Sequence, residues 1–277
     1  MKNNLASAAL VLLAPVSAQA ACTLAQPPNM NLGTYTGAVS SAGSTNITVS
    51  CKGNSEDYTI GLNAGTGAGA TTSTRKMTGP ASATLNYGLF RDAAHAQNWG
   101  NVVGVDTASG SGKTKDRNFT IYPQVSAGQL VAPGTYVDTI ATGTRSFTVT
   151  AVVHPLCQIT ATNLAFGAYT GGVLDAVSTL TVTCTKTTTY YVNLSDGQQP
   201  DGSFLPRAIG PGGGLLSYTM FYDAARNSRW GNTYDVDGVA GTGSGSAQTL
   251  NVYGRVTAGQ FVTPGTYTDT VIATITY

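Results

Sequence analysis

The sequence predicts an all-β protein made of two tandem β-sandwich domains, and three observations support this prediction. Charged residues form only 10% of the 277-residue chain, which also contains 34 glycines, so long helices stabilised by surface ion pairs are disfavoured. Short runs of alternating apolar and polar residues recur between turns rich in Gly and Pro, as in an antiparallel sandwich. The second half of the chain repeats the first over a period far longer than that of a solenoid repeat.

The first 20 residues are predicted to be a secretory signal peptide. A basic start is followed by an apolar stretch over 5–16 and by the small-x-small sequence of 18–20, which is typical of a cleavage site. The apolar stretch is too short to cross a bilayer. We therefore expect an exported chain that begins at or near Ala21. Lipidation of Cys22 is the alternative, but Gln19 stands where lipoprotein signals have an aliphatic residue.

The charge balance argues against nucleic acid as a partner. The chain has 14 Lys and Arg against 13 Asp and Glu, a net charge of +1, and neither half is basic. Proteins that bind nucleic acid or anionic membranes usually show a basic patch or stripe. We therefore expect no nucleic-acid partner.

Four cysteines predict two disulfides, one in each half. Cys22 and Cys51 lie 29 residues apart, and Cys157 and Cys184 lie 27 apart. In an oxidising compartment such neighbours pair, and each bridge would contribute roughly 3–4 kcal/mol in the chain-entropy model. Zinc is the competing interpretation, but the sequence has no CxxC motif and its two histidines lie apart.

Five alternating runs in each half are predicted to be strands. In order along the chain, the alternating runs lie at 45–51, 57–63, 84–91, 118–125 and 135–142, then at 178–184, 189–195, 216–222, 248–256 and 266–276. The halves also share motifs: 33–37 matches 167–171, 47–51 matches 180–184, 89–94 matches 220–225, and 128–139 matches 259–270. We expect a signal peptide over 1–20, one domain over 21–144, a connecting segment over 145–156 and a second domain over 157–277.

These motifs together resemble the spore coat protein U domain. The features are a cysteine near the start, a second cysteine in a strand about 28 residues later, a central aromatic-x-Asp-Ala-Ala and a final Pro-Gly-x-Tyr-x-Asp-Thr. The family includes pilin subunits of archaic, Csu-type chaperone–usher pili. The resemblance covers nearly all of the mature chain, twice. It implies immunoglobulin-like, pilin-type sandwiches that lack their final strand. It also implies three partners: a periplasmic chaperone, an outer-membrane usher, and the donor strand of an adjacent subunit, which is added to a sheet edge.

The segment 145–156 has too many apolar residues for an ordinary linker. Phe147, Val149, Ala151 and Val153 alternate with Ser or Thr for most of its length, which is the period of a strand. In such a sandwich the missing final strand leaves an open groove that exposes the hydrophobic core. We expect this segment to fill that groove in the first domain as an intramolecular donor strand. An extended spacer between the domains is the alternative. Val149→Gly would lower the stability of the first domain in the former case and would be harmless in the latter.

The second domain is expected to be an acceptor for a strand from another chain. Its final strand would carry Tyr267, Val271, Ala273, Ile275 and Tyr277, with no further segment to complete the sandwich. At the other end, Cys22 follows the predicted cleavage site so closely that no donor extension is expected. A subunit that accepts but does not donate stands at the tip of a fibre. We therefore expect the first domain to face outward.

No catalytic group, metal site or cofactor is predicted. His95 and His154 lie in no recognisable catalytic arrangement, and the cysteines are assigned to disulfides. Asp92 and Asp223 are expected to cap short turns. The group 235–238 has too few ligands for a calcium loop. The repeated Trp99 and Trp230 are expected to pack in the cores, the alternative being stacking on a sugar. We predict that the protein is not an enzyme.

Loops of the first domain are the candidates for adhesion because they differ most between the halves. They are Arg75, Lys76 and Met77 in one loop, and Val102, Val103 and Val105 in another. The expected function is that of a tip adhesin, exported through the periplasm to the cell surface, which binds an unknown surface or receptor and supports biofilm formation. The alternatives are a structural minor pilin or coat protein without its own ligand, and a secreted carbohydrate-binding protein.

Overall fold

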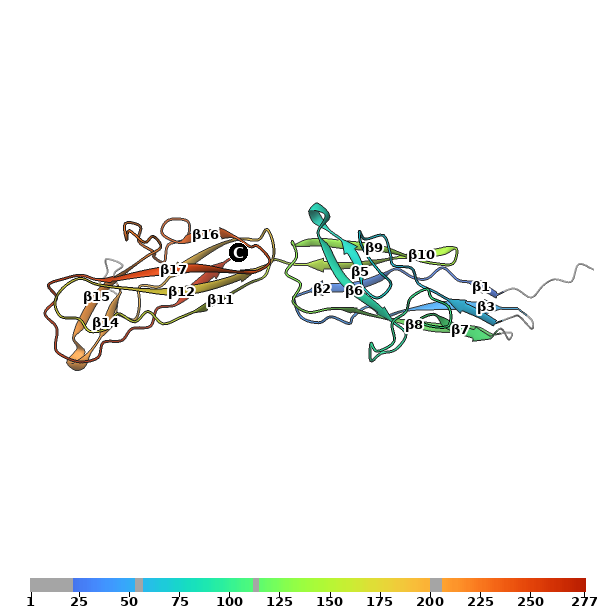
Figure 1. Ribbon diagram of the computed structural model, residues 1–277, viewed down its shortest axis with the longest axis horizontal. Coiled ribbons are helices and arrows are strands. Elements are labelled where there is room, and N and C mark those ends of the chain that lie inside the picture. Colours follow the sequence, from blue (N-terminus) through green and yellow to red (C-terminus); the bar gives the residue numbers. More distant parts are fainter. Residues whose placement is uncertain (1–21, 53–56, 112–114, 200–205) are drawn as a thin grey trace, which may run out of the picture.

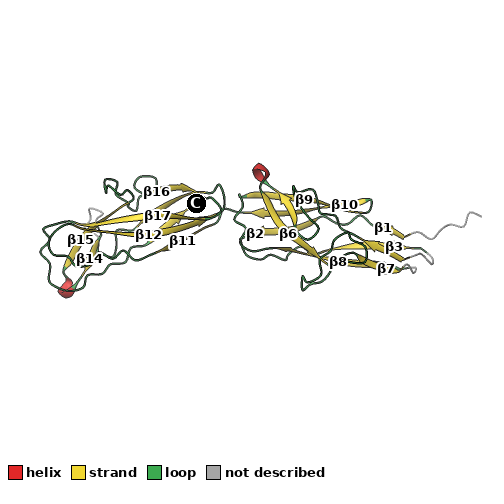
Figure 2. Cartoon of the chain, in the orientation of Figure 1, coloured by secondary structure: helices red, strands yellow, loops and turns green. Residues whose placement is uncertain are grey.

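The computed structural model describes residues 22–52, 57–111, 115–199 and 206–277. Two β-rich domains lie end to end along the long axis of the molecule (Figure 1). Helix is confined in the described residues to two short 3-10 turns, η1 (Pro80–Ser82) and η2 (Pro211–Gly213), shown in red in Figure 2. No helix in these ranges has the length and apolar character needed to span a bilayer. The predicted signal peptide lies outside the described residues.

Domain 1 is built mainly from one eight-stranded sheet. Its strands are β1 (Cys22–Leu24), β2 (Met30–Tyr35), β3 (Thr45–Cys51), β5 (Arg75–Thr78), β6 (Thr84–Phe90), β8 (Asp116–Val125), β9 (Gly134–Thr142) and β10 (Arg145–Val153), in the order β1-β3-β8-β6-β5-β9-β10-β2. A separate two-stranded sheet pairs β4 (Asp57–Ile60) with β7 (Ala108–Ser111). Side chains from both sheets form one buried cluster.

Domain 2 repeats this plan with fewer strands. One sheet has the order β11-β12-β17-β15-β14, made by Cys157–Ala161, Leu174–Cys184, Ala247–Val256, Leu215–Phe221 and Arg207–Ile209 respectively. The other has the order β16-β13-β18, made by Val239–Thr242, Thr189–Leu194 and Ala273–Thr276. In the described residues, no strand of domain 2 corresponds to β2, β10 or most of β9 of domain 1.

Each domain has a buried tryptophan and a disulfide at matching positions. Trp99 and Trp230 are each 1% exposed, and their indole Nε1–H groups donate to the carbonyls of Ile60 (2.9 Å) and Val192 (2.8 Å). A buried indole needs such a partner for its N–H, so the expectation of core packing is confirmed. Disulfides join Cys22 to Cys51 and Cys157 to Cys184, as the spacing predicts. Each links the first strand of its domain to the neighbouring strand.

The strands agree with the alternating runs except at the end of the chain. Each expected run contains a strand, and the strands that were not expected have three to six residues, as β5 and β7 do. The expected strand over 266–276 is wrong in extent, because only Ala273–Thr276 forms a ladder, with β13. Its counterpart β9 is regular over nine residues because β10 lies beside it. A strand without a neighbour leaves its backbone groups without ladder partners.

Candidate functional site: one filled groove and one open groove

Strand β10 lies between β9 and β2 and completes the sheet of domain 1. It is antiparallel to β9 along its whole length, from Arg145 opposite Thr142 to Val153 opposite Gly134. It runs parallel to β2, with Val149 opposite Met30. The chain reaches this position through the turn at 143–144, which makes β9 and β10 a hairpin. The segment is therefore a strand of the sandwich and not an exposed spacer.

Alternate side chains of β10 enter the core of domain 1. Phe147, Val149, Ala151 and Val153 are 2%, 0%, 1% and 3% exposed. The residues between them, such as Thr148 and Thr150, are half-buried on the opposite face. Strand geometry places successive side chains on opposite faces. One row of β10 therefore supplies core side chains between β9 and β2.

In the part of the chain that the structure describes, no such strand lies against the matching positions of domain 2. Six pairs of equivalent residues surround the groove, and in each pair the first is buried in domain 1 while the second is half-buried in domain 2: Met30 and Leu164, Leu32 and Phe166, Tyr35 and Tyr169, Tyr136 and Tyr267, Ile140 and Val271, Thr142 and Ala273. The apolar members in domain 2 still pack against its core cluster. Domain 2 therefore keeps the residues of the groove and leaves them partly open to solvent.

A buried tyrosine–aspartate pair shows the same difference between the domains. Tyr87 donates to Asp138 and Tyr218 donates to Asp269, each through its hydroxyl at 2.8 Å. Burial, together with the neighbouring carboxylate, raises the pKa of both tyrosines, so each hydroxyl keeps its proton and donates. Asp138 is 1% exposed, whereas Asp269 is half-buried. The missing strand beside residues 266–272 accounts for the difference.

Two of the candidate adhesive residues require correction. Arg75 and Met77 lie on β5, and both are fully buried, so neither is available on the surface. The guanidinium of Arg75 donates to the carbonyls of Asn63 (2.9 Å), Thr72 (2.7 Å), Leu62 (3.1 Å) and Trp99 (2.6 Å). Burial lowers its pKa to about 10, so it remains a cation at neutral pH. Lys76, between them, is half-buried.

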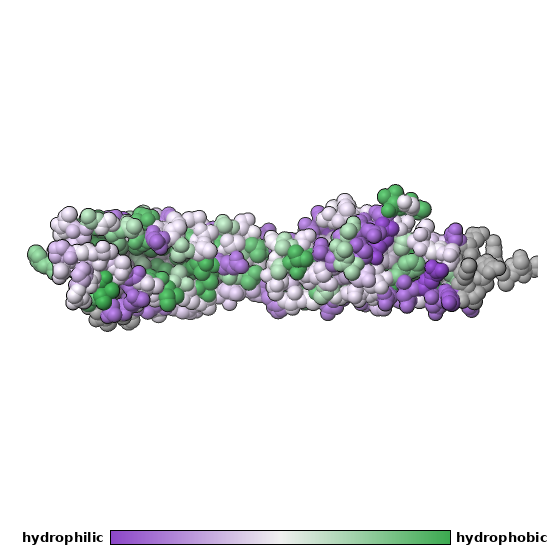
Figure 3. Space-filling view, turned by 90° about the horizontal axis from the view of Figure 1, so that it is seen from below, coloured by the Kyte–Doolittle hydropathy of each residue, from purple (hydrophilic) through white to green (hydrophobic). Residues whose placement is uncertain are grey.

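The second candidate loop is an exposed apolar turn. Val102, Val103 and Val105 are 52%, 70% and 71% exposed. Asp106 fixes the turn, because its carboxylate accepts from the backbone N–H of Val102 at 2.7 Å and its own N–H donates to the carbonyl of that residue. Figure 3 shows one strongly hydrophobic projection on domain 1. The three valines are thus presented on a rigid turn.

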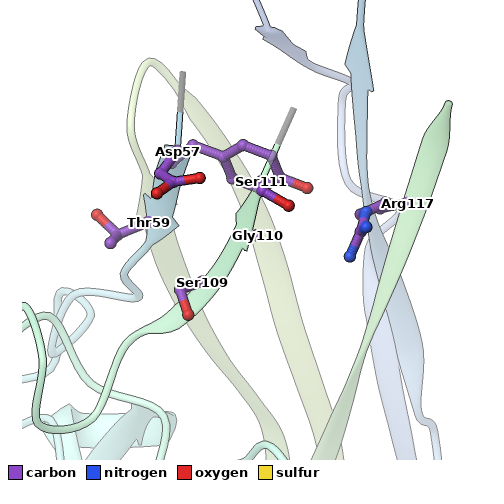
Figure 4. A pocket seen from close by; sticks show the side chains of 7 residues that line it. Asp57, Thr59, Ser109, Gly110, Ser111 and Arg117 are labelled. Carbon is purple, nitrogen blue, oxygen red and sulfur yellow. The ribbon is translucent and has the colours of Figure 1, made fainter. Parts of the chain in front are cut away.

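A shallow polar pocket lies at the end of domain 1 far from domain 2 (Figures 1 and 4). It has a volume of about 460 Å³, and Asp57, Thr59, Ser109, Ser111 and Arg117 contribute polar side chains to it. Strands β4 and β7 form one wall, and Arg117 on β8 faces them in Figure 4. Charged groups of both signs and several hydroxyls suit a polar ligand.

The comparisons with known proteins identify the family. The model of the Spore Coat Protein U domain matches residues 7–143 and again 143–274. The chain belongs to the Spore Coat Protein U domain family. Protein U of Myxococcus xanthus is 34% identical over 155 residues, which are 50% of this chain and 86% of the relative. A coat domain is a structural module, which agrees with the prediction that the protein is not an enzyme.

Comparison with solved structures supports the fold of the chain. The chain is similar to a structure of the CsuC–CsuE chaperone–tip adhesion subunit pre-assembly complex from archaic chaperone–usher Csu pili of Acinetobacter baumannii. The TM-score is 0.55 at 16% identity, over 93% of this chain and 100% of that chain. This likeness establishes the pilin-type, immunoglobulin-like fold. The match to the CupB6 tip adhesin of Pseudomonas aeruginosa covers 93% of this chain and 94% of that chain at 10% identity. Its TM-score of 0.34 is too low to establish a shared fold.

Sequence reasoning missed one wall of each groove in these Spore Coat Protein U domains. Strand β2 and its counterpart at 164–169 were not among the expected strands. The signal was present, because apolar residues precede the shared Gly-x-Tyr-Thr-Gly motif at alternate positions, Met30 and Leu32 in one half and Leu164 and Phe166 in the other. The glycine of the motif has a positive φ in both halves, 73° at Gly33 and 81° at Gly167. That break in the backbone shortens the run and hides its strand period.

Proposed function

We propose that this protein is the tip adhesin of an archaic chaperone–usher pilus and that domain 2 joins it to the fibre by donor-strand complementation. The observation that supports this most directly is the set of six matched positions around the groove, buried in domain 1 and half-buried in domain 2. Domain 1 contains its own completing strand. The described residues of domain 2 form the matching groove without such a strand. Adding a strand to a sheet edge is an established mode of protein assembly.

Because the groove is filled in domain 1 and open in domain 2, the chain can have only one orientation in the fibre. Because β10 already occupies the groove of domain 1, this domain has no place for a strand from a neighbour. Domain 2 would first receive a strand of a periplasmic chaperone and then, at the outer-membrane usher, the donor strand of the adjacent subunit. Domain 2 thus faces the fibre and domain 1 faces outward. Export through the periplasm and the outer-membrane usher would bring the protein to the cell surface.

Completing domain 2 within the chain tests this proposal. A second copy of residues 143–154 is attached after Tyr277 through a flexible Gly–Ser linker of about eight residues, long enough to span the turn. We expect the melting temperature of domain 2 to rise by about 10 °C, the shift produced by roughly 2–3 kcal/mol in a domain of this size. Calorimetry measures the change, with domain 1 as the internal reference. A control copy with Asp at positions 147, 149, 151 and 153 should have no effect. An unchanged melting temperature with the apolar copy contradicts the proposal.

We assign adhesion to the apolar turn of Val102, Val103 and Val105 in domain 1. Contacts made by this turn would attach the pilus to a surface and so support biofilm formation. Val103→Ser with Val105→Ser should reduce attachment of piliated cells to a hydrophobic surface by about tenfold, because exposed apolar side chains supply most of the contact energy there. The matched control is Val236→Ser, 79% exposed in the corresponding turn of domain 2. Counting fibres by electron microscopy separates lost attachment from lost assembly.

A polar receptor is the second candidate ligand, and the pocket at the outer end of domain 1 favours it. In that case Arg117→Ala reduces attachment and the two valine substitutions do not. A structural pilin without a ligand predicts that neither change matters while fibres still form.

A further inference from the structure

The junction between the two domains of this chain shows how one such domain packs against the next. Strand β10 ends at Val153 and β11 begins at Cys157, so only three residues connect the strand that completes domain 1 to the body of domain 2. So short a connection brings the end of domain 1 directly against domain 2. The loop of domain 1 at this end is formed by residues 128–133.

Contacts at this junction involve Leu130 and Gly37 of domain 1. The backbone N–H of Lys186 in domain 2 donates to the carbonyl of Leu130 at 3.0 Å. Gly245 of domain 2 packs so closely that a Cβ there would lie 2.9 Å from the same carbonyl oxygen. A Cβ at Gly37 would lie 3.5 Å from a methyl carbon of Leu156. The side chain of Leu130 is half-buried in this setting.

The equivalent surface of domain 2 is uncovered. Phe261 is the counterpart of Leu130 and is 103% exposed, the highest value among the exposed large hydrophobic residues. Gly171 is the counterpart of Gly37, and a Cβ there would meet nothing within 4 Å. The supporting backbone is the same in both domains, because the N–H of Gly128 donates to Gly37 and that of Gly259 donates to Gly171. A loop with the same scaffold therefore presents a larger apolar side chain to solvent.

We infer that the loop 259–264 is a docking surface for the next Spore Coat Protein U domain of the fibre, with Phe261 as its anchor. The occupant presents a turn that follows its second disulfide cysteine, as residues 185–188 do here, and a glycine that allows close approach. This contact is separate from the groove and rests on the proposed function. A donor segment that fills the groove of domain 2 with an equally short connection delivers its own domain to Phe261.

A duplicated chain tests the inference with surfaces that already exist in this protein. Residues 143–277 are repeated after Tyr277 through the same Gly–Ser linker, so that the added β10 can fill domain 2 and the added domain can reach residue 261. Phe261→Cys then reports on coverage through its rate of reaction with a thiol reagent. All four natural cysteines are held in disulfides and do not compete.

We expect Cys at position 261 of the first copy to react about tenfold more slowly in the duplicated chain than in the natural chain, because a covered thiol reacts only when the junction opens. To isolate that position, the second copy keeps Phe261. Val236→Cys, in an exposed turn, should react at the same rate in both chains. Leu130→Cys in the natural chain gives the rate for the equivalent, half-buried position of the existing junction.

The outcomes separate the docking surface from the function on which it rests. Hydrogen exchange at residues 266–272 shows whether the added strand fills the groove. A filled groove with fast reaction at position 261 overturns the docking surface and leaves the proposed function standing. If the thiol at position 261 already reacts slowly in the natural chain, the docking surface is overturned as well. A groove that stays empty contradicts the proposed function, and the inference falls with it.

Discussion

Phe147→Ala is expected to lower the free energy of unfolding of domain 1 by about 3–5 kcal/mol, the usual cost of truncating a fully buried phenylalanine. Phe147 is 2% exposed and belongs to the core cluster of domain 1, although it lies in the segment that connects the two domains. The loss includes both the transfer free energy of the ring and the cavity that remains. In a marginally stable domain, a change of this size unfolds a large fraction of the molecules.

Differential scanning calorimetry and urea titration measure this effect, with the transition of domain 2 as an internal reference. The matched control is Thr148→Ala on the opposite face of β10, where the side chain is half-buried and the expected change is within about 0.5–1 kcal/mol. Val149→Gly should behave as Phe147→Ala does, because its side chain is 0% exposed. Equal small changes for Phe147 and Thr148 would mean that β10 does not hold domain 1 together in solution.

The all-β fold and its duplication could be predicted because both depend on patterns between residues that are close in the sequence. Alternation locates most strands, and the motifs ending in Cys51 and Cys184 or built on Pro-Gly-x-Tyr fix the match between the halves. The state of the final strand could not be predicted from alternation, since residues 266–272 alternate as well as β9 does. Whether such a run forms a ladder depends on the strand beside it: β10 follows β9 directly as a hairpin, and the described residues of domain 2 contain no strand in that place. The comparison with domain 1 therefore shows which neighbour the run lacks.

The surface exposure of the candidate loops of domain 1 was predicted only in part, for a different reason. Val102, Val103 and Val105 are exposed, but the neighbouring prediction for Arg75 and Met77 is wrong. A basic residue between Thr-rich stretches usually lies in a solvated loop. Here β5 is only four residues long, so its strand period is hard to detect. The guanidinium satisfies backbone carbonyls that come from 3, 12, 13 and 24 residues away, a set that no local pattern marks.

Arg75→Met is therefore expected to destabilise domain 1 by about 4 kcal/mol, within the range measured when a buried charged group loses or leaves its partners. The methionine keeps much of the apolar volume but leaves the carbonyls of Leu62, Asn63 and Trp99 without this donor. One of these carbonyls belongs to Trp99, whose indole N–H donates to the carbonyl of Ile60 in the core. Loss of the guanidinium also removes the cation that lies near Asp138 and Asp106.

Lys76→Met is the matched control, because Lys76 is the next residue of β5, is half-buried and carries the same charge. Its replacement should change the free energy of unfolding by less than about 1 kcal/mol. Domain 2 again serves as the reference, since the strand position that matches Arg75 is occupied there by Pro206, which pairs through its carbonyl with Tyr218. If the two substitutions destabilise domain 1 equally in urea titrations, the buried guanidinium does not contribute as a donor to the carbonyls around Trp99. A large difference places Arg75 in the buried framework around Trp99, which lies only a few residues from the exposed turn of Val102, Val103 and Val105.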